Sequence, residues 1–347
     1  QVLSFRRQYP AWLYPGQSVR DPSQNPLVVQ ADYLLDPILP WTWARTARQI
    51  AQYMPGLTII QWWTTFWAPA FAGLAALLKR HSISLLFLVH NVLPHEPRAF
   101  DPWLARLALR AGDAYIVGTF QEQERLLKLF PKAPVHVYPH PVYDIFSSPL
   151  IPQEKAKEQL GLPTDRQVVL FFGIIRAYKG LKHLIEALAD LKQRGISLSL
   201  VVAGEFWEDK AGYTQQIERL CLGNQVHLFD RYIPNEEIPM IFGAADVCVA
   251  PYIGGTQSGS LKLAMGYGLP LVASRNVVDD EMKRMENQGV YITDPGDVQG
   301  LANAITQALA WRSLRSVKGE ESYIHKDSGW RGLVRLIETI AQQIHNQ

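Results

Sequence analysis

Short, uninterrupted apolar runs alternate with longer amphipathic segments along almost the whole chain. Because these runs are continuously apolar, we expect strands that are covered on both faces, as in parallel sheets with crossover helices. A helix is predicted between Gly180 and Gly195, where leucine and isoleucine recur at helical spacing. The predicted strands lie at 57–63, 84–90, 113–119, 135–139, 167–173, 198–204, 225–230, 246–252 and 269–274.

A stretch rich in serine and proline, 147–155, separates two such α/β halves. At 347 residues the chain is longer than a single hydrophobic core usually supports, so we expect two Rossmann-type domains. We place them at 1–148 and 149–320, with the ligand at the carboxyl ends of the strands. The segment 321–347 ends in an amphipathic helical pattern. The chain opens on what looks like a strand already under way, so either the fold begins late or an N-terminal piece is absent.

Charge and tryptophan are unevenly distributed. Residues 1–110 carry ten Lys/Arg against five Asp/Glu, a balance of +5, and seven of the ten tryptophans lie by Trp103. This pattern suggests an anionic or membrane partner for the first half, unless it is local compositional variation. Cys221 and Cys248 have neither disulfide nor metal-ligand spacing, which fits a reducing compartment and a cytoplasmic location, including the inner face of a membrane. The uncharged stretch from Pro55 to Leu78 fits a strand followed by a helix better than a membrane span.

The segment FFGIIRAYKG (171–180) is a strand, a turn at Gly173 and then two cations, Arg176 and Lys179, just before a helix. Cations at a helix N-terminus face the unfavourable end of the dipole. We therefore expect an anion here, and a diphosphate would fit. The alternative is a solvated helix start.

A second junction follows the strand that ends near Pro251, in the segment TQSGSLKLAMGYGLP (256–270). The first turn of its predicted helix offers free backbone N–H groups and a positive dipole end, an anion site that needs no charged side chain. The alternative is an ordinary Ser/Thr cap. Two such junctions in one Rossmann domain suggest a nucleoside diphosphate, held here by Thr256, Gln257, Ser258, Gly259 and Ser260.

The order FFGxxRxYKG, VVAGEF, DVCVAPYxxGTQSG and AMGYGLPLVAS resembles the carboxyl-terminal domain of family 4 retaining glycosyltransferases of the GT-B fold, in its TQSG variant branch. LVHNVLPHE, DAYIVGT and VYPHPVYDIF are similar to that family's acceptor domain. The resemblance implies two Rossmann-like domains whose parallel sheets face an interdomain cleft, with the last helix crossing back to the first domain. It also implies transfer of a hexose from a nucleoside-diphosphate sugar, with retention, to a glycan, lipid-linked or small-molecule hydroxyl.

The resemblance assigns roles where residues match. Lys179 matches the lysine that holds the donor diphosphate, and His90 matches a catalytic histidine that approaches the donor sugar. The base-contacting loop corresponds to Arg231, Tyr232 and Ile233. Glu205, at another strand end facing the expected cleft, joins them as a candidate base or ribose ligand.

Several positions depart from the family pattern. Ile174 stands where the second diphosphate cation is usual, and Arg176 is a candidate substitute. The two glutamates that usually bind donor sugar and ribose would fall at Gly255 and Leu263, so both are absent. The resemblance further implies that a first strand and a Gly-rich loop precede residue 1.

No Asp-x-Asp motif and no His/Cys cluster indicates a metal, and no cofactor beyond the donor and no nucleic acid is expected. Asp279, Asp280 and Glu281 either touch a donor hydroxyl or form a solvated helix start. Two other functions stay open. One is a non-catalytic GT-B protein that binds a nucleotide or glycan, or scaffolds a partner enzyme. The other is a sugar-nucleotide epimerase, which would need carboxylates such as Glu96 and Glu205 in the cleft.

Overall fold

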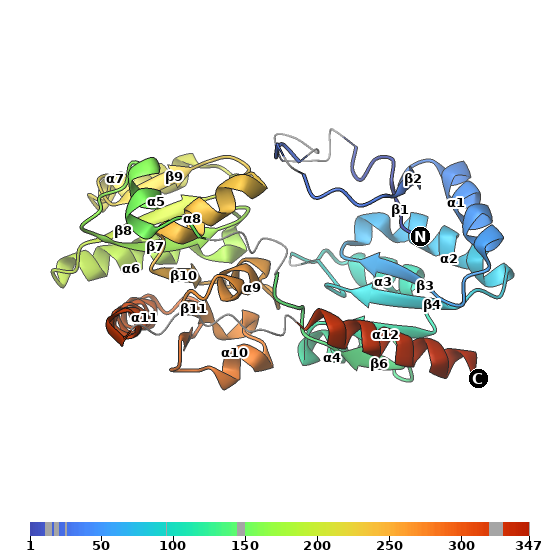
Figure 1. Ribbon diagram of the computed structural model, residues 1–347. Coiled ribbons are helices and arrows are strands. Elements are labelled where there is room, and N and C mark those ends of the chain that lie inside the picture. Colours follow the sequence, from blue (N-terminus) through green and yellow to red (C-terminus); the bar gives the residue numbers. More distant parts are fainter. Residues whose placement is uncertain are drawn as a thin grey trace. The chain divides into compact units, whose positions relative to one another are not determined.

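The computed structural model describes residues 1–10, 16, 21–24, 26–94, 96–143, 150–318 and 329–346, without the side chains of 315–318. The chain divides into two compact units (Figure 1). The first comprises Gln1–Pro15, Leu27–His140 and Trp330–Gln347, and the second comprises Gly16–Pro26 and Pro141–Gly329. The domain boundary expected at 148/149 lies outside the described residues.

The second unit is built on a six-stranded parallel sheet, with strand order β12-β11-β10-β7-β8-β9. This is the doubly wound order, in which the chain reverses direction across the sheet between the neighbouring central strands β7 and β10. The parallel sheet predicted from continuous apolar runs is confirmed. Its strands are β7 (Gln167–Phe172), β8 (Leu198–Ala203), β9 (Val226–Phe229), β10 (Val247–Ala250), β11 (Leu271–Ser274) and β12 (Val290–Thr293).

Helices cover both faces of this sheet, and successive strand residues pack into opposite cores. Val169, for example, packs in one core and Leu170 in the other. The Leu170 core is shared with α5 (Gln153–Gln159), α8 (Ile238–Ala244), α9 (Gly259–Gly266) and α10 (Asp280–Arg284). The Val169 core is shared with α6 (Leu181–Gln193), α7 (Ala211–Arg219) and α11 (Val298–Lys318). Burial on both faces explains why the strands contain so few polar residues.

The first unit contains a four-stranded parallel sheet, β3-β4-β5-β6, and a separate parallel pair, β1-β2. One core holds side chains of α1 to α4, and α12 packs on the other side against Leu86, Ala114 and Ile116 (Figure 1). The elements are β1 (Leu3–Phe5), β2 (Asp32–Leu35), α1 (Pro40–Tyr53), β3 (Thr58–Trp62), α2 (Ala68–Arg80), β4 (Leu85–Val89), α3 (Asp101–Leu109), β5 (Ala114–Val117), α4 (Phe120–Leu129), β6 (Val135–Val137) and α12 (Trp330–His345).

The described tryptophans of the first unit range from fully buried to largely exposed. Trp62 and Trp67 are completely buried, and Trp67 stacks on Phe71 inside the core. Trp41 and Trp103, in contrast, are about two-thirds exposed, at 68% and 65%. The uncharged stretch from 55 to 78 forms β3 and most of α2, as predicted, and no helix in the described ranges has the length and apolar character needed to cross a bilayer.

Candidate functional site

The central strands β7 and β10 bring their following loops to the same edge of the sheet. Gly180, at the start of α6, has φ of +73°, and a Cβ there would lie 2.0 Å from the carbonyl oxygen of Pro251. In addition, the N–H groups of Ile253 and Gly254 donate to the carbonyl of Tyr178 at 2.8 and 3.2 Å. The loop after β7 is therefore packed directly against the loop after β10.

Tyr252 connects the two junctions that the sequence singled out. The ammonium of Lys179 lies 5.5 Å from the centre of the Tyr252 ring, and a Cβ on Gly173 would lie 3.4 Å from the same ammonium. The Tyr252 hydroxyl lies 3.3 Å from Ser258 Oγ and 3.4 Å from Ser260 Oγ. Lys179 and the serines thus surround one tyrosine, which was not among the predicted site residues although it lies two positions after β10.

The N-terminus of α9 presents backbone donors at this place. Ser258 caps the helix in extended conformation, and its Oγ accepts a hydrogen bond from Leu261 N at 3.4 Å. The N–H groups of the first turn, at Gly259 and Ser260, have no carbonyl of their own helix to bind. A Cβ on Gly259 would meet Tyr143 at an ordinary 3.6 Å, so packing within the protein does not require glycine there. Thr256 is 2% exposed, and Gln257, beside it, is half-buried.

Arg176 has a different partner from Lys179. Its guanidinium lies 4.9 Å from the centre of the Trp207 ring, and Trp207 Nε1 donates to Glu205 Oε2 at 3.0 Å. Glu205 is buried at the end of β8, and its carbonyl accepts from Ile175 N at 2.8 Å. The structure therefore joins Arg176 to Glu205 through an indole, and joins Lys179 to the serines through a phenol.

The loop 231–233 lies after β9, the strand beside β8. Arg231 forms a bidentate ion pair with Glu237, Tyr232 is 44% exposed, and Ile233 packs in the core. The segment 21–24 is hydrogen bonded to this region. Ser23 Oγ accepts from Asn235 N at 2.9 Å, and Gln24 N donates to Glu236 Oε1 at 2.9 Å.

Asp21 belongs to the same segment. Burial alone would raise its pKa, but hydrogen bonds from Ser23, Asn235 and Tyr232 lower the pKa below its usual value. This segment was not predicted as part of the site, since no local pattern links residues 21–24 to a loop two hundred positions away.

His90 lies in the first unit, directly after β4. The backbone N–H of His90 donates to the carbonyl of Trp62 at 2.8 Å, and the ring Nε2 lies 3.4 Å from Gln61 Oε1. Burial lowers the pKa of His90, and the nearby His140, whose ring centre is 6.3 Å away, lowers it further. The structure thus favours a neutral imidazole at position 90, which can both donate and accept a hydrogen bond.

The amino-acid sequence of the second unit matches a known family over its whole α/β core. Residues 152–324 match the family of glycosyl transferases group 1. This part of the chain is a group 1 glycosyltransferase domain. Its relatives include a D-inositol 3-phosphate glycosyltransferase of Catenulispora acidiphila, 30% identical over 58% of this chain and 50% of the relative. A 2-deoxystreptamine glucosyltransferase of Streptomyces kanamyceticus is 31% identical over 45% of this chain and 40% of the relative.

Solved structures extend the likeness to the fold of both units. Sucrose-phosphate synthase of Thermosynechococcus elongatus superposes with a TM-score of 0.68 at 19% identity, covering 94% of this chain and 87% of that one. HepE of Anabaena, in complex with UDP-glucose, gives 0.67 at 19% identity over 91% and 86%. The expected GT-B fold, with two Rossmann-like domains and parallel sheets, is thereby confirmed. The alignments with the first curated relatives cover about half the length of those proteins.

Positions 255 and 263, where the resemblance would place two glutamates, hold a glycine and a leucine in the glycosyltransferase domain. Gly255 has φ of +91°, a backbone conformation that L side chains rarely adopt, so this loop conformation disfavours a glutamate at 255. Leu263 is buried in the core. At the two positions where the resemblance places glutamates, the structure therefore has a positive φ at 255 and a buried leucine side chain at 263.

A buried lysine that the sequence analysis missed organises the next loop of the glycosyltransferase domain. Lys262, on α9, is almost fully buried and lies 2.7 Å from both Asp279 and Glu281. Asp279 Oδ1 also accepts from Met282 N, which caps α10, while Asp280 pairs with Lys283 at the surface. The acidic cluster is therefore a cap plus an ion-pair network that ties α10 to α9. Within the described ranges, no three His, Cys, Asp or Glu side chains lie together as metal ligands would.

Proposed function

We propose that this chain transfers a hexose from a nucleoside-diphosphate sugar to an acceptor hydroxyl with retention of configuration, as a family 4 glycosyltransferase of the TQSG variant. One observation carries the proposal: Lys179 and the two serines at the start of α9 all lie against Tyr252. Tyr252 follows β10, which lies beside β7 where the strand order of the doubly wound sheet reverses. In open α/β sheets this is where ligands bind. A diphosphate fits because an ammonium and free backbone N–H groups converge there.

The proposed roles follow from these contacts. Lys179, next to Gly173, and the N–H groups of Gly259 and Ser260 would hold the diphosphate, with Thr256, Gln257 and Ser258 shaping the loop. Arg176, held over Trp207, would reach the same phosphates from the β8 side. The ribose would bind at Glu205, and the base would bind along the main chain of Arg231, Tyr232 and Ile233.

The chemistry we propose is carried mainly by positioning and electrostatics. The acceptor oxygen bonds to the anomeric carbon while the bond from that carbon to the diphosphate oxygen breaks, and the diphosphate takes the acceptor proton. Lys179 and α9 stabilise the charge that develops on the leaving group, so neither a metal nor a cofactor is required. His90, kept neutral by burial, would hydrogen bond to the donor sugar.

The acceptor we propose is a hydroxyl of a glycan or a lipid-linked molecule, reached by a cytoplasmic protein at the inner face of a membrane. The uneven charge supports this view, since residues 1–110 carry ten Lys/Arg against five Asp/Glu, a balance of +5. A second candidate is a non-catalytic protein that binds a nucleotide or glycan, and the glycine and leucine at positions 255 and 263 favour it.

The test is a panel of UDP-, GDP- and ADP-sugars, scored both for binding by calorimetry and for release of the nucleoside diphosphate. Lys179→Ala should abolish binding of the preferred nucleotide and leave the thermal midpoint almost unchanged, because the side chain is half exposed. Lys182→Ala is the matched control, since Lys182 makes a comparable contact, 5.5 Å from the ring of Tyr213. Binding without any turnover would favour the non-catalytic candidate. Unchanged affinity in Lys179→Ala would refute the diphosphate site.

A further inference from the structure

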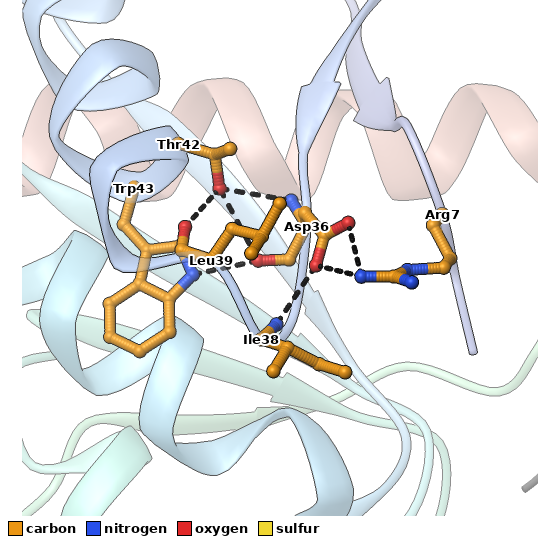
Figure 2. A network of polar contacts seen from close by, with 6 residues as sticks. All are labelled: Arg7, Asp36, Ile38, Leu39, Thr42 and Trp43. Atoms are coloured by element: carbon orange, nitrogen blue, oxygen red, sulfur yellow. Dashed lines mark hydrogen bonds and ion pairs between the residues drawn. The ribbon is translucent and has the colours of Figure 1, made fainter. Parts of the chain in front are cut away.

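Helix α1 of the first unit has a firmly fixed start (Figure 2). The carboxylate of Asp36 accepts from Arg7 Nη2 and from Ile38 N at 3.0 Å, and its carbonyl accepts from Trp43 Nε1 at 2.8 Å. Thr42 Oγ1 donates to the carbonyl of Leu39 at 2.6 Å. These bonds fix the direction in which the first turn of the helix presents its side chains.

The two tryptophans of this turn point to opposite sides. Trp43 packs against α2, where a Cβ on Gly73 would lie only 2.6 Å from its ring. Residues two positions apart on a helix face nearly opposite directions, since each residue adds about 100° of rotation. Trp41 is therefore turned outward, and 68% of it is exposed. Its exposure is built into the packing of α1 on α2.

Trp41 begins a row of exposed side chains along α1, which we call the α1 stripe: Trp41, Arg45, Arg48 and Gln52. The spacing of four, three and four residues places them on one helix face. The helix contains no Asp or Glu, and within the described part of the chain neither arginine forms an ion pair. Exposed apolar residues mark both ends of the helix, Ile38 before it and Met54, 85% exposed, after it.

We propose that the α1 stripe docks the first unit onto a membrane surface that carries anionic lipid headgroups. The guanidinium groups of Arg45 and Arg48 match lipid phosphates in charge and geometry. An indole such as that of Trp41 prefers the boundary between headgroups and acyl chains. A soluble polyanion would need only the arginines, whereas a membrane also accounts for the exposed Trp41, Ile38 and Met54. This docking does not depend on the sugar-transfer proposal.

The experiment is co-sedimentation of the full chain with phosphatidylcholine vesicles, prepared with and without phosphatidylglycerol. We expect binding that needs phosphatidylglycerol and weakens with salt. The double variant Arg45→Gln/Arg48→Gln should weaken binding roughly fivefold for each arginine removed. Trp41→Ala should also weaken it, while Trp103→Ala, which removes an equally exposed indole from α3, should not.

A second control removes two exposed charges from the other unit. Lys155→Gln/Arg219→Gln, on α5 and α7, has the same net charge as the stripe variant and should bind vesicles like the parent chain. Equal binding to both vesicle types, or an equal loss in this control, would overturn the proposal. Retention on a heparin column without vesicle binding would assign the stripe to a soluble polyanion instead. Thermal midpoints of all variants establish that each one is folded.

Discussion

At the carboxyl edge of the first unit's sheet, His140 influences the protonation of His90. His90 follows β4, and His140 lies near it with ring centres 6.3 Å apart, while the ring of Trp330 covers His140 edge-on at 5.9 Å. Burial and the repulsion from His140 both lower the pKa of His90. The surroundings of His90 therefore make its protonation unfavourable in the folded protein, and its imidazole stays neutral near neutral pH.

We therefore predict that His140→Phe raises the pKa of His90, because the charge repulsion disappears while the aromatic contact with Trp330 remains. In the parent chain the pKa of His90 lies below its unfolded value of 6.5, so the unfolded state binds more protons in acid. Stability from this group is complete above that value and is lost as the pH falls below it. The variant should lose less stability on acidification. NMR titration of the His90 ring measures the shift directly, and an unchanged pKa would contradict the mechanism.

At the scale of elements, the loop that carries His90 depends on a buried carboxylate from α4. Glu122 is fully buried, and its two oxygens accept from Val92 N and from Arg125 at 2.6 Å each. Thr119 caps the same helix by accepting from Glu122 N at 3.2 Å. The start of α4 thereby holds the backbone two residues beyond His90.

We predict that Glu122→Ala lowers the rate of sugar transfer at least tenfold, because the His90 loop loses its support, and leaves donor affinity in the second unit unchanged. Glu122→Gln, which keeps an oxygen for Val92 N, should recover part of that loss. Asp113 is the control, since it accepts from Leu85 N at the opposite end of β4 and pairs with Lys79. Asp113→Ala should destabilise the fold without this loss of rate. Steady-state kinetics and thermal melting separate the two effects.

The two ends of α6 provide a matched pair of glycines. Gly180 and Gly195 have similar positive φ values, +73° and +80°. A Cβ at 180 would strike Pro251, whereas one at 195 would meet nothing within 4 Å. Gly195→Ala should therefore cost only the backbone strain, about 1–2 kcal/mol. Gly180→Ala should cost more and also weaken nucleotide binding, since it pushes the two loops apart. Equal losses of stability in denaturant titrations, with nucleotide affinity retained in both variants, would contradict this account.

Local patterns predicted most elements but few of their long-range contacts. Each of the nine predicted strands forms, because a run buried on both faces is recognisable from its own residues. The short strands β2 and β12 were not predicted. Asp32 begins the first and Thr293 ends the second, so each has an apolar run of only three residues. Lys262, Glu122 and Tyr252 were missed for another reason. Each has a partner outside its own helix or strand, such as Asp279 for Lys262, Val92 for Glu122 and Lys179 for Tyr252, so only the fold reveals their roles.

At the scale of the whole molecule, the candidate donor site lies in the second unit, whereas most of the tryptophans lie in the first. The second unit has a complete doubly wound sheet with a core on each face, and the candidate donor site lies within it. The first unit has its own cores and holds nearly all of the tryptophans. In the second unit only Trp207 and Trp311 occur. Tryptophan emission therefore reports mainly on the first unit.

This distribution predicts that donor nucleotide stabilises one of two unfolding transitions. At a hundredfold excess over its Kd, the nucleotide should stabilise the second unit by about 2.7 kcal/mol, which corresponds to roughly 5–10 °C for a unit of this size. Calorimetry should show that transition moving, while the melting curve from tryptophan emission moves little, because Trp41, Trp62 and Trp67 lie in the first unit. Lys179→Ala should abolish the calorimetric shift. If both transitions rise together, the units unfold as one cooperative body, and nucleotide bound to the second unit also stabilises the unit that carries His90 and the α1 stripe.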